Sequence, residues 1–355
     1  MKITFQRVAI VLSLLLSLTL TGCTPGNNST NSTANQGESL AKRAGQGSSA
    51  ATMPGSGVDG ASEQAQRGAN AGMPAKADGT SRDTAGAEEA VDRGPVTILM
   101  YHHVTKRGFF ANNDAVVTVD DFAKQMAYLK ENNYHVVPLR LVADYYAQGA
   151  STSLPSKAVA ITFDDGYESN YALAYPILKE YGYPFTVFVV ANWIAEESAG
   201  PFRPERQELL SWPQILEMVQ SGLGDIQSHS FDSHYRFNDG GYALAHAQTN
   251  PATGEKESTE ALTARIYRDL AQSKELLERR TGIPGYALAY PWGKHSDATK
   301  QAATQAGYLL AVTMTEGANG ARADRLALKR TGVFMSDGFD GFVHKLKAER
   351  AAVQP

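Results

Sequence analysis

Two adjacent carboxylates, Asp164 and Asp165, follow a short apolar segment and precede Gly166. Apolar residues alternate with small ones over residues 158–163, a pattern that favours a buried strand over a helix. Consecutive strand side chains point to opposite faces, so both carboxylates can serve one site only where the strand ends and the backbone turns, which Gly166 permits. Two carboxylates held together repel unless a cation lies between them or one is protonated. The alternative is a surface turn, since Asp-Asp-Gly is common in turns.

Two histidines, His229 and His234, follow a further predicted strand and are five residues apart. This differs from the i, i+4 spacing that places two ligands on one helix face. It fits a strand end and a loop that folds back, because residues 230–233 have a turn-forming composition. Two histidines and one carboxylate that leave a position open for water are the usual ligands of a hydrolytic zinc site. A lone histidine is more often structural, but the pair together with Asp165 favours a metal site.

The composition limits the class of protein. The chain has 355 residues, of which 43% are hydrophobic and 20% charged, and its net charge is −4. This is an ordinary globular composition, with enough apolar residues for one large core or two small ones. It is not basic enough to make nucleic acid the main partner. Cys23 is the single cysteine, which excludes an internal disulfide and a cysteine-rich zinc site, so a metal must be held by histidine and carboxylate.

The first 23 residues, 1–23, resemble an export signal. Lys2 and Arg7 form a basic start, and residues 8–20 are an apolar run that is short for a membrane span. The run ends in Leu-Thr-Gly-Cys23, which resembles a bacterial lipobox, in which the peptide is cut before the cysteine and the cysteine carries the lipid. We therefore expect an extracytoplasmic, membrane-anchored lipoprotein, at the cell surface or facing the periplasm. A plain secretory signal with an incidental cysteine is the alternative.

Residues 24–93 predict a disordered linker. Gly, Ser, Ala, Asn, Thr and Gln dominate this segment, which has no aromatic residue and one leucine, Leu40. Such a sequence cannot bury enough apolar surface to fold. As a flexible chain of about 70 residues it would reach roughly 45 Å. That suits a spacer between a membrane and a catalytic domain at residues 94–355, and a tail without a role fits the composition as well.

Beyond residue 94 the sequence alternates predicted strands with predicted helices. The strands cover residues 96–100, 136–137, 158–163, 185–190, 225–229, 286–290, 308–313 and 327–334. The helices cover residues 120–132, 139–148, 169–181, 212–221, 263–280, 296–306 and 339–349. Such alternation implies βαβ units and a parallel sheet. With roughly seven repeats in about 260 residues, we expect an α/β fold, a distorted (β/α) barrel with about seven strands.

In a β/α barrel the active site lies at the C-terminal ends of the strands. Four polar segments of this chain fall at such ends. They are Asp164-Asp165, His229, the triplet Tyr101-His102-His103 and the turn Pro291-Trp292-Gly293. One such coincidence carries little weight because loops are generally polar, but four in one chain predict a common site.

Three of these motifs together resemble a known family. Thr162-Phe-Asp-Asp-Gly166, the pair His229/His234 and the Pro-Trp-Gly turn resemble the NodB-homology polysaccharide deacetylases, carbohydrate esterase family four, over about residues 95–335. Most members space the two histidines four apart. The five-residue form, with Tyr-His near the start of the domain, looks like the branch that deacetylates poly-β-1,6-N-acetylglucosamine in biofilms, in which the motif order is circularly permuted.

The resemblance implies a role for each matching residue. Asp165, His229 and His234 would bind a divalent metal, zinc first, with cobalt or nickel as alternatives. Asp164 would be the general base. His102, which matches the catalytic histidine found late in other members, would be the general acid.

The Pro-Trp-Gly turn implies further roles. The backbone N–H of Trp292 occupies the position that helps to hold the oxyanion. Many members carry an arginine just before this turn that pairs with the catalytic aspartate, whereas this chain has Ala289 and Tyr290 there. Arg330, near the end of a later strand, is the candidate substitute. Tyr167 and Trp292 are the expected sugar-contacting residues, because sugar rings stack on aromatic faces.

These features predict metal-dependent hydrolysis of N-acetyl groups from a cell-surface polysaccharide, poly-β-1,6-N-acetylglucosamine first, with release of acetate. The same site acting on peptidoglycan, chitin oligomers or acetylated xylan is one alternative. A non-catalytic carbohydrate-binding lipoprotein is another, supported only by the unfilled arginine position. The expected partners are the N-acetylated polymer, the membrane that holds the lipid, and a polysaccharide synthesis or export machinery, with no nucleic acid.

Overall fold

The structure is a computed structural model that describes residues 95–107, 109–110, 115–148 and 153–353. The predicted signal peptide with Cys23 and the predicted linker at 24–93 lie outside the described residues. Within the described ranges, no helix combines the length and the apolar character that crossing a membrane requires.

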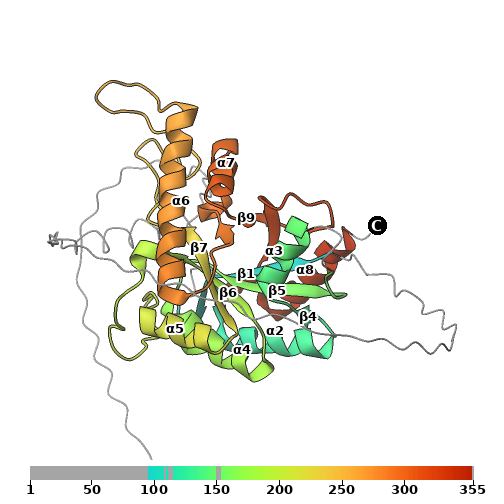
Figure 1. The fold of residues 1–355 in the computed structure, drawn as a ribbon. Helices are drawn as coiled ribbons and strands as arrows, with labels where there is room; N and C mark the ends of the chain where they lie inside the picture. The colour runs from blue at the N-terminus through green and yellow to red at the C-terminus, as the bar shows by residue number, and fades with distance from the viewer. Residues whose placement is uncertain (1–94, 108, 111–114, 149–152, 354–355) are drawn as a thin grey trace, which may run out of the picture. The chain divides into compact units, whose positions relative to one another are not determined.

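Seven parallel strands close into a barrel (Figure 1). They are β1 (Thr97–Tyr101), β5 (Ala158–Phe163), β6 (Phe185–Val190), β7 (Gly224–Ser230), β8 (Ala287–Ala289), β9 (Leu310–Glu316) and β10 (Leu328–Gly332). Their order is β1, β10, β9, β8, β7, β6, β5, and the pairing of β1 with β5 closes the ring. The short strand β4 (His135–Val136) pairs with the start of β5. The predicted α/β barrel with about seven strands is therefore confirmed.

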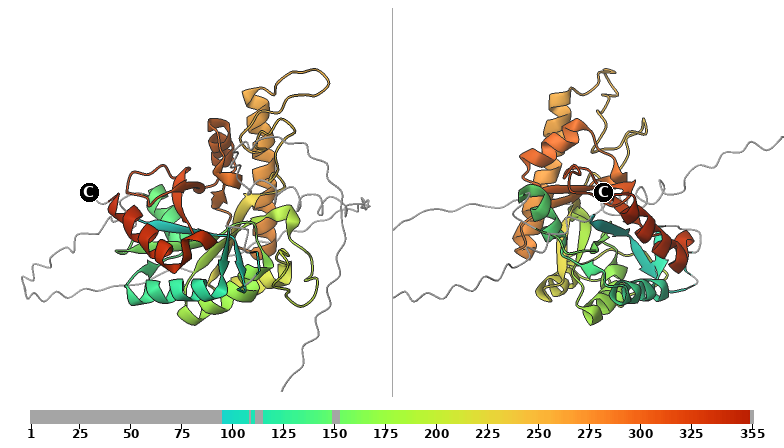
Figure 2. Two further views of the ribbon diagram at one scale, coloured as in Figure 1. Left: turned by 180° about the vertical axis from the view of Figure 1, so that it is seen from behind. Right: turned by 90° about the vertical axis from the view of Figure 1, so that its right-hand side faces the viewer.

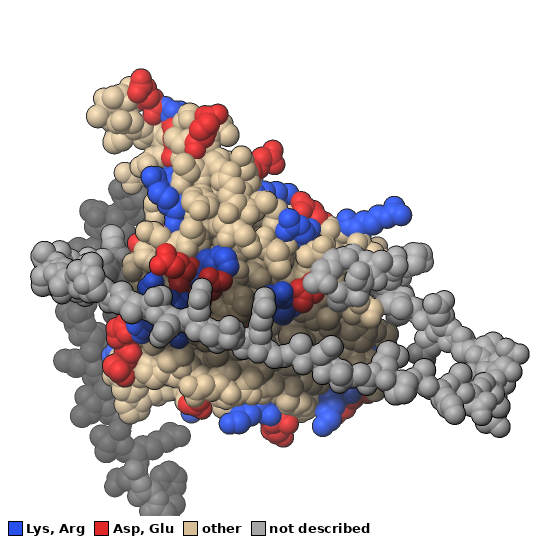
Figure 3. Space-filling view, in the orientation of Figure 1, with Lys and Arg blue, Asp and Glu red and all other residues tan. Residues whose placement is uncertain are grey.

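Seven helices of the described chain surround these strands. They are α2 (Val119–Glu131), α3 (Leu139–Gln148), α4 (Tyr175–Tyr181), α5 (Trp212–Gln220), α6 (Thr259–Thr281), α7 (Asp297–Gln305) and α8 (Gly338–Ala351). Figures 1 and 2 show α6 and α7 side by side, and α2 alongside α4 and α8. On the face displayed in Figure 3, Lys and Arg side chains are interspersed with Asp and Glu.

Strands β1, β5 and β6 of the barrel are buried on both faces. Every residue of β1, β5 and β6 is buried, and alternate residues enter different clusters because strand side chains alternate in direction. Leu99 and Ile161 pack in the cluster that includes residues of α2 and α5, whereas Ile98 and Ala160 belong to a cluster that includes residues of α3. Burial on both faces explains why these strands read as nearly continuous apolar runs in the sequence.

Some features of the fold differ from the sequence-based expectation. Strands β2 (His103–Thr105) and β3 (Val116–Thr118) form a separate parallel pair that was not predicted. A single residue separates β2 from β1, so the pattern gave no sign of two strands. Helix α6 begins at Thr259, four residues earlier than expected, because the side chain of Ser258 accepts a hydrogen bond from the backbone N–H of Ala261 and caps it.

Candidate active site

Asp165, His229 and His234 come together at the C-terminal end of the barrel. One ligand atom from each lies within 4.8 Å of the other two. Nε2 of His229 and Nε2 of His234 are each 3.5 Å from Oδ1 of Asp165. One carboxylate and two imidazoles at these distances fit a single divalent ion with a position left open for water.

The protonation of the two imidazoles also fits a metal site. Burial lowers the pKa of His229 and of His234 from 6.5 to about 4, so both rings are neutral at neutral pH. Nδ1 of His229 lies 2.8 Å from the carbonyl oxygen of Ala289, and donation from Nδ1 leaves the lone pair on Nε2. A lone pair that faces the Asp165 carboxylate is repelled by it unless a cation lies between them. The donor set therefore fits a bound cation.

The backbone after β5 adopts an uncommon conformation to present these carboxylates. Asp165 has φ 70° and Gly166 has φ 71°, in the left-handed region that aspartate tolerates better than most residues. A Cβ atom at Gly166 would lie 2.9 Å from Cγ1 of Val189. Only glycine fits there, so the turn that separates the two aspartates depends on Gly166.

Strand β7 carries an extra residue at His229. Val189 of β6 pairs with Ser228, whereas Val190 pairs with Ser230, so the register shifts by one residue between them. A bulge of this kind redirects a side chain and is common beside active sites. It accounts for a predicted metal ligand that lies within a strand rather than after it.

The turn between the two histidines is held by Asp269 of α6. Its carboxylate accepts hydrogen bonds from the backbone N–H groups of Phe231 and Asp232, at 2.9 and 3.0 Å, and from Oγ of Ser233 at 2.6 Å. Because one carboxylate satisfies three donors, the loop has one well-defined path back to His234. The five-residue spacing is thus a structured turn.

Asp164 forms a bidentate ion pair with Arg330. Nη1 and Nη2 of Arg330 lie 2.7 and 2.6 Å from Oδ1 and Oδ2 of Asp164, and Nε of Arg330 donates to the carbonyl oxygen of Thr313. Burial alone would raise the pKa of Asp164, but the Arg330 guanidinium, with His229 and His102, brings it below its usual range. The two adjacent aspartates therefore coexist because Asp164 faces a cation of its own, and the arginine that was expected near the end of a later strand lies beside it.

His102 lies at the end of β1, next to this ion pair. Its Nε2 is 4.0 Å from Oδ2 of Asp164, and its side chain is 14% exposed, so the ring is within reach of a ligand. Its carbonyl oxygen accepts a hydrogen bond of 2.8 Å from Nδ2 of Asn170. Asn170 begins a π-helical turn, η3 (Asn170–Ala174), and such turns are frequent at functional sites.

His103 is a buried structural residue and is not part of the candidate site. It is 1% exposed, and its Nδ1 lies 2.9 Å from Oγ of Ser169. The same Oγ accepts a hydrogen bond from the backbone N–H of Val104. Burial lowers the pKa of His103 to about 4, so the ring is neutral. Ser169 and Asn170 together fix the backbone from the predicted acid, His102, to Val104.

Trp292, in the turn η5 (Pro291–Gly293) that follows β8, lies against the group of Asp165, His229 and His234, which we call the candidate metal group or, in short, the metal group. Its ring is 4.1 Å from the ring of His234, centroid to centroid. Its φ of 54° is unusual for a bulky residue, and strain of this kind persists mainly at functional sites. A Cβ atom at Gly293 would lie 2.5 Å from the backbone nitrogen of Met314. Glycine is therefore required where this turn passes β9.

Tyr167 is less accessible than a sugar-stacking residue usually is. It is 3% exposed, and its ring packs edge-on against His103. Burial and the neighbouring Asp165 carboxylate raise its pKa well above the usual value, so its protonated hydroxyl can donate to Asp165. A sugar contact by Tyr167 stays a prediction.

Three residues that position the site were not identified from the sequence: Ser169, Asn170 and Asp269. The first two bond the backbone of His102 and Val104, more than 60 residues away in the chain, and no local pattern reveals such contacts. Asp269 does leave a signal, because it lies beside the buried Leu270 on the apolar side of an amphipathic helix.

The chain matches the family model named Polysaccharide deacetylase over residues 151–311. It is 30% identical over 244 residues to YxkH of Bacillus subtilis (strain 168), which is named for the same family, and the match covers 69% of this chain and 72% of that protein. Two relatives named poly-beta-1,6-N-acetyl-D-glucosamine N-deacetylase are 26% identical. The one from Staphylococcus aureus (strain MRSA252) matches 70% of this chain and 81% of its own length. For the one from Escherichia coli (strain K12) the shares are 57% and 32%, so the chain spans about a third of that relative.

A solved structure of a de-N-acetylase from Aggregatibacter actinomycetemcomitans superposes with a TM-score of 0.59 and 25% sequence identity. The superposition covers 71% of this chain and 99% of the solved one. A relative with 30% identity over more than two thirds of both chains shows that the protein belongs to the polysaccharide deacetylase family. Members of this family are hydrolases of N-acetyl amide bonds.

Proposed function

We propose that the protein removes N-acetyl groups from poly-β-1,6-N-acetylglucosamine and that the reaction depends on a divalent metal. Zinc is the first candidate, with cobalt or nickel as alternatives for a site of two imidazoles and a carboxylate. The observation that carries the proposal is the meeting of three parts at one barrel end: the Asp165–His229–His234 group, the Asp164–Arg330 pair and His102. The relatives from S. aureus and E. coli, which are named for this polymer, support it as the substrate.

Asp164 is the base in this proposal. A divalent ion at Asp165, His229 and His234 would polarise the acetyl carbonyl and make a water molecule easier to deprotonate. Asp164 then accepts the proton of the attacking water. Its lowered pKa keeps the carboxylate ionised, and the two hydrogen bonds from Arg330 fix its orientation. Arg330 is 0% exposed, so it acts as a positioning residue.

His102 and Trp292 complete the reaction. His102 donates a proton to the departing amine, which a histidine can do near neutral pH. The backbone N–H of Trp292 stabilises the oxyanion, and loss of one such donor typically lowers kcat by about 10²–10³-fold. The products are acetate and a glucosamine unit that carries a positive charge.

Acetate release from defined oligomers tests the proposal. We expect release from β-1,6-linked N-acetylglucosamine oligomers, slower release from β-1,4-linked oligomers, and none after a chelator removes the metal. Faster release from β-1,4-linked oligomers, or from acetylated xylan, would identify that polymer as the substrate instead. Activity that survives complete removal of metal would contradict the metal dependence.

The non-catalytic alternative has lost its support. It rested on the missing arginine before the Pro-Trp-Gly turn, and Arg330 forms the corresponding pair with Asp164 from β10. Glycan binding by metal-loaded protein without any acetate release would restore it.

We further propose that the protein works outside the cytoplasm, anchored through lipid on Cys23 and spaced from the membrane by residues 24–93. The support is the Leu-Thr-Gly-Cys23 sequence and the composition of the segment after it. Cys23→Ser should move the protein from the membrane fraction to the soluble fraction and abolish labelling with a radioactive fatty acid. An unchanged membrane fraction would refute the anchor. A synthesis or export machinery as partner stays a prediction.

A further inference from the structure

We propose that Arg236, Tyr242 and Lys294 form, together with Trp292, a sugar-binding subsite that rejects protonated glucosamine. We call these four residues the cationic subsite. The inference rests on the deacetylase function proposed above and specifies which units of the polymer are accepted next to the unit that reacts.

The aromatic part of the cationic subsite begins at the metal group. The ring of Trp292 lies 4.1 Å from the ring of His234, and the ring of Tyr242 lies 5.2 Å from that of Trp292. Trp292 and Tyr242 are both partly exposed. Aromatic faces of this kind accept the apolar faces of sugar rings. The surface therefore suits a neighbour of the unit whose acetyl group is attacked.

Two cations flank this surface. The guanidinium of Arg236 and the ammonium of Lys294 lie 5.0 and 5.8 Å from the ring centroid of Tyr242. Among the described residues, neither of them forms an ion pair with a carboxylate. The acid of the same hairpin, Asp239, is bonded to His246 and to the backbone N–H of Gly241. The subsite therefore carries two positive charges that no bonded acid neutralises.

Arg236 is held in place by a small hairpin. It pairs with Tyr242 across an antiparallel bridge. The turn between them is closed by the backbone N–H of Phe237, which donates to the carbonyl of Gly241 at 2.8 Å. Nε of Arg236 donates to the carbonyl of Gly240 at 2.9 Å. The guanidinium is thus fixed beside the tyrosine before any ligand arrives.

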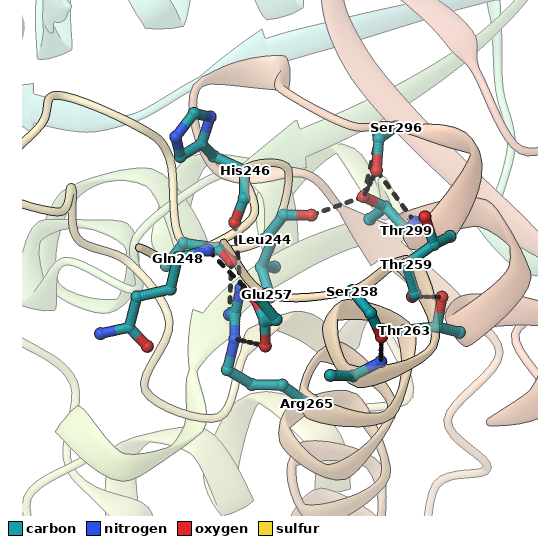
Figure 4. A network of polar contacts seen from close by, with 12 residues as sticks. Leu244, His246, Gln248, Glu257, Ser258, Thr259, Thr263, Arg265, Ser296 and Thr299 are labelled. Atoms are coloured by element: carbon teal, nitrogen blue, oxygen red, sulfur yellow. Dashed lines mark hydrogen bonds and ion pairs between the residues drawn. The ribbon is translucent and has the colours of Figure 1, made fainter. Parts of the chain in front are cut away.

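The segment after the hairpin is tied to α6 and α7 (Figure 4). Arg265 of α6 donates to the carbonyl oxygens of Ala243 and His246, at 2.7 and 3.0 Å, and forms two bonds of 3.0 Å with Glu257. The hydroxyl of Thr299 in α7 donates to the carbonyl of Leu244. These bonds fix the position of the hairpin against the barrel. The part of the cationic subsite that Arg236 and Tyr242 form is therefore preorganised.

Charge selection follows from the chemistry of the reaction. An N-acetylated unit is neutral, whereas its deacetylated product is a cation at neutral pH. A glucosamine beside Arg236 and Lys294 meets like charges, and like charges placed together disfavour binding. The enzyme therefore avoids positions next to a unit already deacetylated, releases its product, and leaves glucosamine units separated by acetylated ones.

The test uses synthetic pentamers, β-1,6-linked and β-1,4-linked, either fully acetylated or with one glucosamine at each successive position. Acetate release and mass spectrometry report how fast each unit reacts. At low salt we expect units next to glucosamine to react roughly fivefold more slowly. The difference should shrink in 1 M salt, where the screening length falls to about 3 Å. Equal rates in the wild-type protein at low salt would overturn the inference.

Variants separate the charges from the fold. Lys294→Glu should remove or reverse the discrimination, and Arg236→Gln should weaken it, with melting curves showing that each variant is folded. Lys179→Gln is the matched control, because the Lys179 ammonium also lies over a tyrosine ring, at 5.6 Å from Tyr175, but on α4. It should keep the wild-type ratio of rates. Discrimination that survives both Lys294→Glu and Arg236→Gln would overturn the inference.

Failure of the proposed function would look different. In that case neither linkage would release acetate from the fully acetylated pentamer. The affinities of the same pentamers, measured by calorimetry, would then test the cationic subsite. We expect the glucosamine-containing pentamers to bind more weakly. Equal binding of both kinds would overturn the inference on its own.

Discussion

Asp164 and Asp165 are neighbours in sequence with opposite electrostatic surroundings. Asp164 faces a guanidinium that is completely buried, and Asp165 faces two neutral imidazoles. A carboxylate paired with arginine stays ionised and oriented, whereas a carboxylate among imidazole lone pairs suits metal binding. The two aspartates therefore suit different roles, base and ligand, because the backbone turns between them.

Arg330 should matter for both stability and turnover. Removal of one partner of a buried ion pair costs roughly 3–5 kcal/mol, so Arg330→Met should lower the free energy of unfolding and, by freeing Asp164, reduce kcat by about 10²-fold. Arg330→Lys keeps the charge but not the two parallel hydrogen bonds, and should restore stability more than turnover. Urea denaturation and acetate release measure the two effects. An unchanged kcat in Arg330→Met would show that the pair does not orient the base.

Base and ligand can be separated by metal analysis. Asp164→Asn should abolish acetate release and leave the metal content unchanged, because Asp164 lies outside the Asp165–His229–His234 group. His229→Ala should lose both the acetate release and the bound metal. Metal content is measured by elemental analysis after dialysis. A His229→Ala protein that retains one metal ion per chain would remove His229 from the ligand set.

At the scale of secondary-structure elements, the geometry of the candidate metal group depends on contacts made by residues that are not ligands themselves. The register shift between β6 and β7 redirects His229, and Asp269 of α6 fixes the turn that leads to His234. Such supporting contacts hold metal ligands in the geometry that the ion requires.

Asp269→Ala should weaken metal binding without changing a ligand. The backbone N–H groups of Phe231 and Asp232 lose their acceptor, so the turn loosens and metal affinity should fall roughly 10–100-fold. Competition with a chromogenic chelator measures this affinity. Glu275→Ala is the matched control on the same helix, since Glu275 forms an exposed ion pair with Arg279, and it should leave the affinity unchanged. Equal affinities in both variants would contradict the role of Asp269.

The elements with the strongest patterns could be predicted from the sequence. Residues 158–163 are buried on both faces, and such a strand gives an apolar run that ends at the two aspartates. The pair β2–β3 could not be predicted because strands of three residues carry no periodicity. The hairpin from Arg236 to Tyr242, beside Trp292, could not be predicted either. Arg265 holds its continuation through backbone carbonyls about 20 residues away, and backbone groups are the same in every sequence.

At the scale of the whole molecule, buried histidines make stability depend on pH. Burial lowers the pKa of His103, His229 and His234 to about 4, from 6.5. As the pH falls from about 6.5 towards 4, the unfolded chain takes up protons that the folded protein does not, so folding becomes less favourable. Their contribution is complete above about pH 6.5 and is lost at about 1.4 kcal/mol per pH unit for each histidine.

Urea denaturation of metal-free protein at pH 7.5 and pH 5.5 measures this dependence. The free energy of unfolding should be lower at pH 5.5, and His103→Gln should reduce the difference. A free energy of unfolding that is equal at the two pH values would show that these rings are not held neutral.

The proposed catalytic residues are also synthesised far apart in time along the chain. Asp164, His102 and Arg330 come from β5, β1 and β10, three strands that lie side by side because β1 pairs with both of the others. β1 is the first strand of the barrel to emerge during translation and β10 is the last. The proposed acid, the proposed base and the guanidinium beside the base can therefore meet only once the whole barrel has been made, so the proposed deacetylation requires the complete barrel.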